Sequence, residues 1–273
     1  MYVEIQAPTR KPITVPALQA MKRDGCKIVA LTAYDASFAY QLEVAGIDLV
    51  LVGDSLGMVV QGHDSTLPVT LEAMVYHCAM VCRGLRSSML VADLPFMSYR
   101  DVDHALQASA RLMAEGGAVM VKLEGGGWVC EIMQRLTERE VPVCAHLGLT
   151  PQSVHKLGGY RVQGRDAAAA EHLLDEARAV QQAGASLLVL EAVPATVAER
   201  ISRELVIPTI GIGAGVDCDG QILVLYDILG ITPGQRPRFS KDFLCDHGSI
   251  PKALRAYAED VRSGRFPTSE HCY

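Results

Sequence analysis

The sequence predicts an α/β fold of the (β/α)8-barrel (TIM-barrel) class. Short apolar runs rich in Val, Ile and Leu occur eight times, and successive runs begin about 28 residues apart. Such near-continuous runs are typical of parallel strands that are covered on both faces. Longer segments with helical periodicity lie between several of them. Eight strand and helix units in about 250 residues match the size of a (β/α)8 barrel.

The expected strands follow one another in chain order and cover Ile28–Ala33, Asp48–Val52, Met89–Ala92, Ala118–Leu123, Val141–Ala145, Leu187–Leu190, Pro208–Ile212 and Ile222–Tyr226. A doubly wound open sheet is the alternative architecture, but it would have fewer strands and a nucleotide-binding fingerprint. Gly211-Ile-Gly213-Ala-Gly215 follows the seventh run and resembles such a fingerprint. Its third glycine comes one residue early, and no acidic residue lies about twenty positions further on. We therefore interpret this glycine run as a tight turn at the rim of a barrel.

Three of the connecting segments carry clear helix signals. Thr70 can cap a helix whose apolar positions recur every three or four residues up to Leu85. The same spacing recurs from Val102 to Leu112 and from Ala167 to Ala183, and glycines follow both segments. No linker, charge block or low-complexity tract divides residues 1–273, so we expect a single catalytic domain. It would have a short N-terminal extension (about 1–27) and a helical C-terminal tail (about 240–273).

Composition excludes several classes of function. The formal net charge of −6 is not that of a protein that binds nucleic acid through a general basic field. Asp48 and Asp54 interrupt the longest apolar stretch well short of the ~18 residues that a membrane span needs. No secretory signal or transit peptide is visible, and the cysteines form no C-x-x-C pair. We therefore expect a cytoplasmic protein with reduced thiols and no zinc site.

Ionisable residues gather where the expected strands end, which is where barrel enzymes carry their chemistry. In chain order these residues are Asp54 (followed by Ser55), Asp93, Lys122 with Glu124, His146, Glu191 and Asp227. In a closed barrel they would converge on one mouth. An Asp after a strand can instead cap the next helix or be solvated, and for Asp227 we favour that simpler interpretation.

Two of these acids indicate a metal site. Asp54 and Asp93 directly follow apolar strands, whereas the next expected helix begins well downstream of each. Carboxylates from adjacent strands are hard oxygen ligands that suit Mg²⁺, which keeps its other positions for water and substrate. Together with Glu124, they favour a Mg²⁺ site.

The other ionisable groups each admit two interpretations. Lys122 and Glu124 are two residues apart, so their side chains point to the same side of a strand. They could form a structural ion pair, or the ammonium group could hold a substrate carboxylate or oxyanion while Glu124 supports the waters of the metal. Glu191 ends an apolar run and precedes Ala-Val-Pro, a setting that suits a general base better than a metal ligand. His146 is either a buried core histidine or a supporting residue of the site.

Two expected connections are long for a compact barrel, Ser55–Val69 and Leu147–Asp166. Loops above about twelve residues are usually lids or binding loops. Both contain glycines, which permit hinge movement over a reaction that requires the exclusion of water. We therefore expect both segments to cover the mouth.

A series of motifs resembles one enzyme family. The motifs are Val52-Gly-Asp-Ser-Leu-Gly-Met58, Gly62-His-Asp-Ser-Thr-Leu-Pro-Val69, Ala92-Asp-Leu-Pro-Phe96, Val121-Lys-Leu-Glu-Gly-Gly126, His146-Leu-Gly-Leu-Thr-Pro-Gln152, Leu190-Glu-Ala-Val-Pro194, Ile210-Gly-Ile-Gly-Ala-Gly215 and Asp219-Gly-Gln221. In this order they resemble the 3-methyl-2-oxobutanoate (ketopantoate) hydroxymethyltransferase family. The resemblance runs from about Ile28 to Phe239 and is weaker outside that range.

The resemblance implies an activity and a set of partners. It implies transfer of a hydroxymethyl group from 5,10-methylenetetrahydrofolate to 3-methyl-2-oxobutanoate, which gives 2-dehydropantoate (ketopantoate) for the synthesis of pantothenate and coenzyme A. It also implies one Mg²⁺ per subunit, an enolate that this metal stabilises, and a cytoplasmic homodecamer without nucleic-acid or membrane partners. It assigns three roles within this chain: metal ligands Asp54, Asp93 and Glu124, substrate contacts Asp54, Ser55, Asp93 and Lys122, and proton acceptor Glu191.

Two alternatives stay open. Another Mg²⁺-dependent, enolate-forming barrel, of the phosphoenolpyruvate mutase and isocitrate lyase type, uses similar strand-end carboxylates but no folate. A non-catalytic scaffold or ligand sensor would tolerate the loss of the strand-end acids, yet all of them are present. Exchange of the C3 proton of 3-methyl-2-oxobutanoate in D₂O with Mg²⁺ would distinguish the three.

Overall fold

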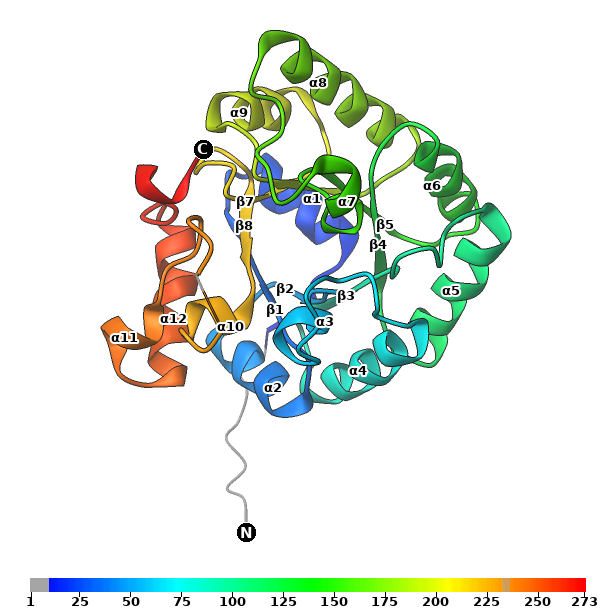
Figure 1. The fold of residues 1–273 in the computed structure, drawn as a ribbon. Coiled ribbons are helices and arrows are strands. Elements are labelled where there is room, and N and C mark those ends of the chain that lie inside the picture. The colour runs from blue at the N-terminus through cyan, green and yellow to red at the C-terminus, as the bar shows by residue number, and fades with distance from the viewer. Residues whose placement is uncertain (1–9, 233, 235) are drawn as a thin grey trace.

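The computed structural model describes residues 10–232, 234 and 236–273. In this part of the chain, eight parallel strands pair in sequence order and β8 pairs with β1, which closes a barrel inside a ring of helices (Figure 1). The predicted (β/α)8 fold is confirmed. The strands are β1 (Ile28–Thr32), β2 (Leu49–Val52), β3 (Met89–Asp93), β4 (Met120–Glu124), β5 (Val143–Gly148), β6 (Leu187–Glu191), β7 (Thr209–Ile212) and β8 (Gly220–Leu223).

The last strand differs from its prediction. We expected Ile222–Tyr226, but β8 ends at Leu223 and the chain turns into the short helix α10 (Leu225–Ile228). The Thr32 hydroxyl accepts a hydrogen bond from Leu225 N at 2.9 Å, which fixes the start of that helix beside β1. Asp227 therefore lies in α10 and not at the end of a strand.

Two glycine positions show why backbone space matters at the closure of the barrel. A Cβ atom on Gly220, where β8 begins, would lie 2.3 Å from the Ile28 carbonyl oxygen of β1. Gly215 has φ of 89°, and a Cβ atom there would lie 2.6 Å from that of Ala195. The Gly211–Gly215 segment is thus a tight turn at the rim, as predicted.

Helices cover the outside of the barrel. The three predicted helices are present as α4 (Leu71–Gly84), α5 (Val102–Ala114) and α8 (Ala167–Gln182), and Thr70 caps α4 through its hydroxyl. Within the described ranges, none of the helices is both long and apolar enough to cross a lipid bilayer. The remaining helices are α1 (Val15–Arg23), α2 (Ala36–Ala45), α3 (Leu56–Val59), α6 (Val129–Thr137), the 3₁₀ turn η1 (Pro151–Ser153), α7 (Val154–Leu157), α9 (Ala195–Glu204), α11 (Phe243–His247), α12 (Ile250–Arg262) and the 3₁₀ turn η2 (Ser269–His271).

Helices near the two ends of the described residues, α1 and α12, complete the barrel. Because α10 has a single turn, α12 supplies the wall beside β1 and α2 (Figure 1). Its Tyr257 is fully buried and donates a hydrogen bond to the Ala30 carbonyl at 2.8 Å. Lys22 of α1 pairs with Asp219, which directly precedes β8, at 2.7 Å. Helix α1 therefore lies where the strands begin and leaves their carboxyl ends open.

A buried carboxylate fastens α2 to the start of β3. The Glu43 side chain accepts hydrogen bonds from the backbone N–H groups of Arg86, Ser87 and Ser88, at 3.0 to 3.1 Å, and from the Ser87 hydroxyl. Burial opposes the charge, but these donors outweigh it and lower the pKa of Glu43 to about 2 from its ordinary 4.5. The ionised form is thus bound more tightly in the folded state than in the unfolded chain.

We expect Glu43→Gln to lower the free energy of unfolding by roughly 2–3 kcal/mol at pH 7, because an amide places its own N–H group against these donors. The contribution of Glu43 is present above pH 4.5 and is lost as pH falls towards 2, since the pKa is lower in the folded state. Urea unfolding at pH 7 and at pH 3 measures the difference, with the exposed Glu131→Gln as control. A loss of unfolding free energy in Glu43→Gln that is equally large at pH 7 and at pH 3 would contradict the assignment of an ionised Glu43.

Candidate active site

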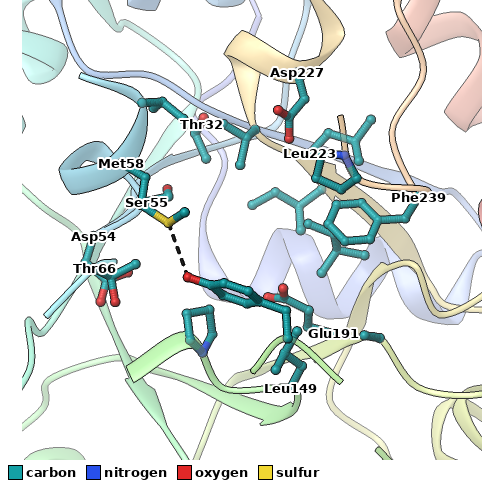
Figure 2. A pocket seen from close by; sticks show the side chains of 18 of the residues that line it. Thr32, Asp54, Ser55, Met58, Thr66, Leu149, Glu191, Leu223, Asp227 and Phe239 are labelled. Carbon is teal, nitrogen blue, oxygen red and sulfur yellow. Dashed lines mark hydrogen bonds between the residues drawn. The ribbon is translucent and has the colours of Figure 1, made fainter. Parts of the chain in front are cut away.

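A cavity of about 930 Å³ opens at the carboxyl ends of the strands (Figure 2). Its walls include every residue that the sequence assigned to a site: Asp54, Ser55, Asp93, Lys122, Glu124, His146 and Glu191. The expected convergence on one mouth is therefore confirmed, and the chemical role of each residue stays a prediction.

Asp54 and Asp93 adjoin at the ends of β2 and β3. The Asp54 backbone N–H donates to Oδ2 of Asp93 at 3.0 Å, and Oδ2 of Asp54 accepts from the Gln152 side-chain amide at 2.8 Å. Burial and the charges of Asp93 and Glu124 together raise the pKa of Asp54 well above its ordinary value, although Lys122 opposes them. The cluster thus carries more negative charge than its environment readily accommodates.

Lys122 pairs with Asp93. Its Nζ atom lies 2.6 Å from Oδ1 of Asp93, and both side chains are buried. Burial disfavours the ammonium form, but Asp93, Glu124 and Asp54 outweigh burial and raise the pKa of Lys122. Of the interpretations left open above, an ion pair is present, but with Asp93 as the partner instead of Glu124.

His146 lies between two carboxylates. Although we placed it at the end of a strand, it is inside β5, with Nδ1 3.5 Å from Oε1 of Glu124 and Nε2 3.3 Å from Oε2 of Glu191. Neither ring nitrogen has a well-aligned hydrogen bond to a described residue, so the contacts are mainly electrostatic. Burial and Lys122 lower the pKa of His146, but the two carboxylates outweigh them and raise it to about 9. Glu191 therefore faces an imidazolium on one side, in addition to the apolar surroundings that the sequence indicated.

Glu124 is ionised and held from two sides. The Gln152 backbone N–H donates to its Oε2 at 2.9 Å, and His146 faces its Oε1. Burial alone would raise the pKa of Glu124, but His146, Lys122 and Gln152 outweigh burial and lower it. Glu124 thereby links the loop that carries Gln152 to the floor of the cavity.

Two residues that organise the site were not predicted from the sequence. Gln152 bonds to Asp54 and Glu124, and its Oε1 accepts from the Tyr99 hydroxyl at 2.6 Å. The Tyr34 hydroxyl lies 2.9 Å from Oγ of Ser55. Gln152 belongs to one of the family motifs, which was the available signal, whereas nothing in the sequence around Tyr34 indicated its partner.

The acids fit Mg²⁺ through two ligands. Within the described residues, no three His, Cys, Asp or Glu side chains come together as a metal site of their own. Mg²⁺ keeps several waters and is usually held by one or two carboxylates plus substrate, so Asp54 and Asp93 are a sufficient donor set. A divalent cation would also relieve the crowding that raises the pKa of Asp54. Glu124 is engaged by Gln152 and His146, just as Asp93 is engaged by Lys122 and the Asp54 N–H, and its role as a third ligand stays a prediction.

The two long connections meet above the cavity. Each contains short helical elements that we did not predict: α3 in the first, and η1 with α7 in the second. The Tyr160 hydroxyl of the second connection donates to the Met58 sulfur of the first at 3.4 Å, drawn as the dashed line in Figure 2. Both residues line the cavity, which places the two segments where lids would lie.

Curated proteins similar to this chain share one description. A family model described as ketopantoate hydroxymethyltransferase matches residues 12–269. The chain is 59% identical over 273 residues to a 3-methyl-2-oxobutanoate hydroxymethyltransferase of Alkalilimnicola ehrlichii, covering 100% of this chain and 99% of that protein. It is 58% identical over 261 residues to the protein of that name from Shewanella loihica, covering 96% and 98%.

Similar solved structures support the architecture. A phosphoenolpyruvate phosphomutase from Streptomyces platensis subsp. rosaceus superposes with a TM-score of 0.59 at 13% identity, covering 79% of this chain and 82% of that one. A phosphonopyruvate hydrolase superposes with a TM-score of 0.60 at 13% identity, covering 79% and 83%. At such low identity the likeness concerns the fold alone, and it gives no separate support to the phosphoenolpyruvate mutase alternative.

Proposed function

The chain belongs to the ketopantoate hydroxymethyltransferase family, which makes it an enzyme of pantothenate biosynthesis, and we propose that Glu191 is the base that starts its reaction. The reaction transfers a hydroxymethyl group from 5,10-methylenetetrahydrofolate to 3-methyl-2-oxobutanoate and gives 2-dehydropantoate. It requires a base, a site for the oxoacid and a Lewis acid. The observation that carries the proposal is that Glu191 shares one cavity with Lys122, Asp54 and Asp93.

Glu191 removes the proton from C3 of the oxoacid. It is the last residue of β6, and its carboxylate is mostly buried and faces the cavity (Figure 2). The contact between its Oε2 and Nε2 of His146 restrains the side chain at 3.3 Å. His146 is protonated at neutral pH, so it positions Glu191 and does not compete for the proton. A positioned base of this kind contributes roughly 10²- to 10⁴-fold to the rate.

Lys122 and Ser55 hold the oxoacid. The Lys122 ammonium is buried and cationic and supplies the positive charge that the substrate carboxylate needs in a cavity with several acids. Ser55 shares a hydrogen bond with Tyr34, which restrains the position of its Oγ atom. Asp54 and Asp93 would hold Mg²⁺, with Glu124 beside them. Bound Mg²⁺ would supply Lewis acidity towards the ketone oxygen, worth several kcal/mol.

The transfer begins with removal of the C3 proton. The C3–H bond breaks and its proton passes to Glu191, while the electron pair forms the enolate. The enolate carbon then forms a C–C bond with the one-carbon unit as the C–N bonds to the folate break. Water gives its hydroxide to the one-carbon unit and releases one proton. This proton and the one held by Glu191 pass to N5 and N10 of the departing tetrahydrofolate.

Deuterium exchange tests this proposal. With Mg²⁺ in D₂O, the protein should replace the C3 proton of 3-methyl-2-oxobutanoate with deuterium in the absence of folate, because proton removal precedes transfer. NMR of the oxoacid measures the uptake, and heat-inactivated protein gives the background. Formation of 2-dehydropantoate without any such exchange would remove the free enolate from the mechanism.

We expect substrate to order the two lids. Backbone amides in residues 55–69 and 147–166 should exchange more slowly when 3-methyl-2-oxobutanoate and Mg²⁺ are bound, because closure excludes water from the reactive one-carbon unit. Hydrogen exchange followed by mass spectrometry measures this, and α12 on the barrel wall serves as an internal reference. Equal exchange rates with and without substrate would show that these segments are not lids.

Assembly and location follow from the family resemblance. We expect a cytoplasmic homodecamer with one Mg²⁺ per subunit. Light scattering and metal analysis of the purified protein would measure the subunit number and the metal content.

A further inference from the structure

The cavity is larger than the oxoacid requires. Sites of roughly 300–1,000 Å³ hold drug-sized molecules, and the volume here is about 930 Å³. The residues assigned to the oxoacid, the metal and the base lie at the carboxyl ends of β2, β3, β4 and β6, from Asp54 through Lys122 to Glu191. A further part of the wall includes Leu223 of β8, Asp227 of α10, Thr232 and residues 236–239, and it has no role in the chemistry described so far.

A buried acid lies in that wall. Asp227 is 4% exposed and lines the cavity, and Figure 2 shows its carboxylate directed inward, across from Glu191. Oδ1 accepts a hydrogen bond from the Thr232 hydroxyl at 2.6 Å. Within the described part of the chain, Asp227 forms no ion pair, and Arg236, which also lines the cavity but pairs with Asp242, favours its ionised form from a greater distance. The carboxylate can therefore accept further hydrogen bonds from a ligand.

The chemistry of the one-carbon donor suits this acid. The pterin of a reduced folate presents its 2-amino group and N3–H side by side, in the same arrangement as two N–H groups of a guanidinium. Such an edge pairs with a carboxylate through two parallel hydrogen bonds. Leu223 and Phe239 lie between Asp227 and Glu191 in Figure 2 and give a flat ring apolar walls. A ring held there would point away from Asp227 towards the oxoacid.

We infer that Asp227 recognises the pterin of the folate donor by accepting hydrogen bonds from its 2-amino group and N3–H. This inference rests on the proposed function and adds a specificity residue to it. It replaces our initial interpretation of Asp227 as a helix cap or a solvated residue, since Asp227 is buried and Val224 occupies the N-cap position of α10. The competing explanation is that Asp227 only braces the loop through Thr232.

Two variants separate recognition from bracing. Asp227→Asn retains an oxygen that can accept from Thr232, but its amide N–H groups face the donors of the pterin. Thr232→Val removes the brace and keeps the carboxylate. We expect Asp227→Asn to raise KM for methylenetetrahydrofolate and Kd for tetrahydrofolate by about 10- to 100-fold, with a much smaller effect of Thr232→Val.

Control measurements show whether a loss of folate affinity comes from recognition by Asp227 or from a structural change. C3 proton exchange without folate should stay at the parent rate in Asp227→Asn, and the exposed Asp103→Asn should change neither measurement. A folate analogue without the 2-amino group should bind the parent more weakly, and Asp227→Asn should weaken its binding less than it weakens that of the complete folate, since the analogue has already lost one of the two hydrogen bonds. The inference would be overturned if Asp227→Asn bound folate like the parent, or if Asp227→Asn and Thr232→Val lost equal folate affinity. Loss of C3 exchange in Asp227→Asn, or binding of the analogue by the parent as tightly as folate, would also overturn it. Absence of exchange in the parent protein would instead contradict the proposed function.

Discussion

Asp54→Asn and Asp93→Asn are each expected to lower kcat/KM at least about 10³-fold, because Lewis-acid stabilisation is worth several kcal/mol and about 1.4 kcal/mol corresponds to a factor of ten. Each variant leaves a single carboxylate to neutralise and hold the divalent ion. The loss should be at least as large as that from removing the base. Initial rates over a range of Mg²⁺ concentrations measure it, with the exposed Asp103→Asn as control.

The same two variants should differ in their free energy of unfolding without metal. Asp93 pairs with the buried ammonium of Lys122, so Asp93→Asn leaves that charge unpaired and should cost roughly 3–5 kcal/mol. Asp54→Asn removes a charge that Asp93 and Glu124 repel, so its free energy of unfolding should stay unchanged or rise. Urea unfolding without Mg²⁺ measures both. Activity with an unaltered dependence on Mg²⁺ in either variant would refute the metal assignment.

Glu191→Gln should lower kcat by about 10²- to 10⁴-fold while the oxoacid still binds. Glutamine keeps the shape and most of the hydrogen bonding of the side chain but cannot accept a proton. C3 exchange without folate should fall with kcat, because it reports proton removal in isolation. Deuterium uptake and thermal midpoint are measured together, and Glu131→Gln on α6 is the matched control.

If Glu191 only braces the rim, Glu191→Gln should lower the thermal midpoint and leave exchange close to that of the parent. That result would move the base elsewhere, and His146 would be the next residue to test. Because the pKa of His146 is raised to about 9, its neutral form predominates only above that pH. A His146 base would therefore give an exchange rate that increases through pH 9.

Local patterns made the fold predictable. An apolar strand and an amphipathic helix each show their period within about ten residues, so the eight runs and the three capped helices could be read along the chain. The ends of the strands were harder to predict, as β8 shows. Its apolar run continues past Leu223, but the contact of Leu225 N with Thr32, far away in the sequence, ends the strand.

The membership of the site was also predictable, but its pairings were not. Parallel strands place their carboxyl ends at one edge, so acids that follow apolar runs must converge once the barrel closes. Which groups pair depends on register between strands. Asp93 lies opposite Lys122, and Glu124 lies opposite His146. Lys122 therefore pairs with Asp93 of the neighbouring strand and not with Glu124 of its own strand.

The sequence by itself determined the (β/α)8 class, the family and the ionisable residues of the mouth, because these depend on local periodicity and on motifs of adjacent residues. Only the tertiary structure decided that Gln152 joins Asp54 to Glu124, that Tyr160 meets Met58 above the cavity, and that Asp227 faces inward from α10. Each of these contacts joins positions far apart in the chain or depends on where a loop turns. Their geometry is set by closure of the barrel and by the packing of its loops, which no short stretch of sequence encodes.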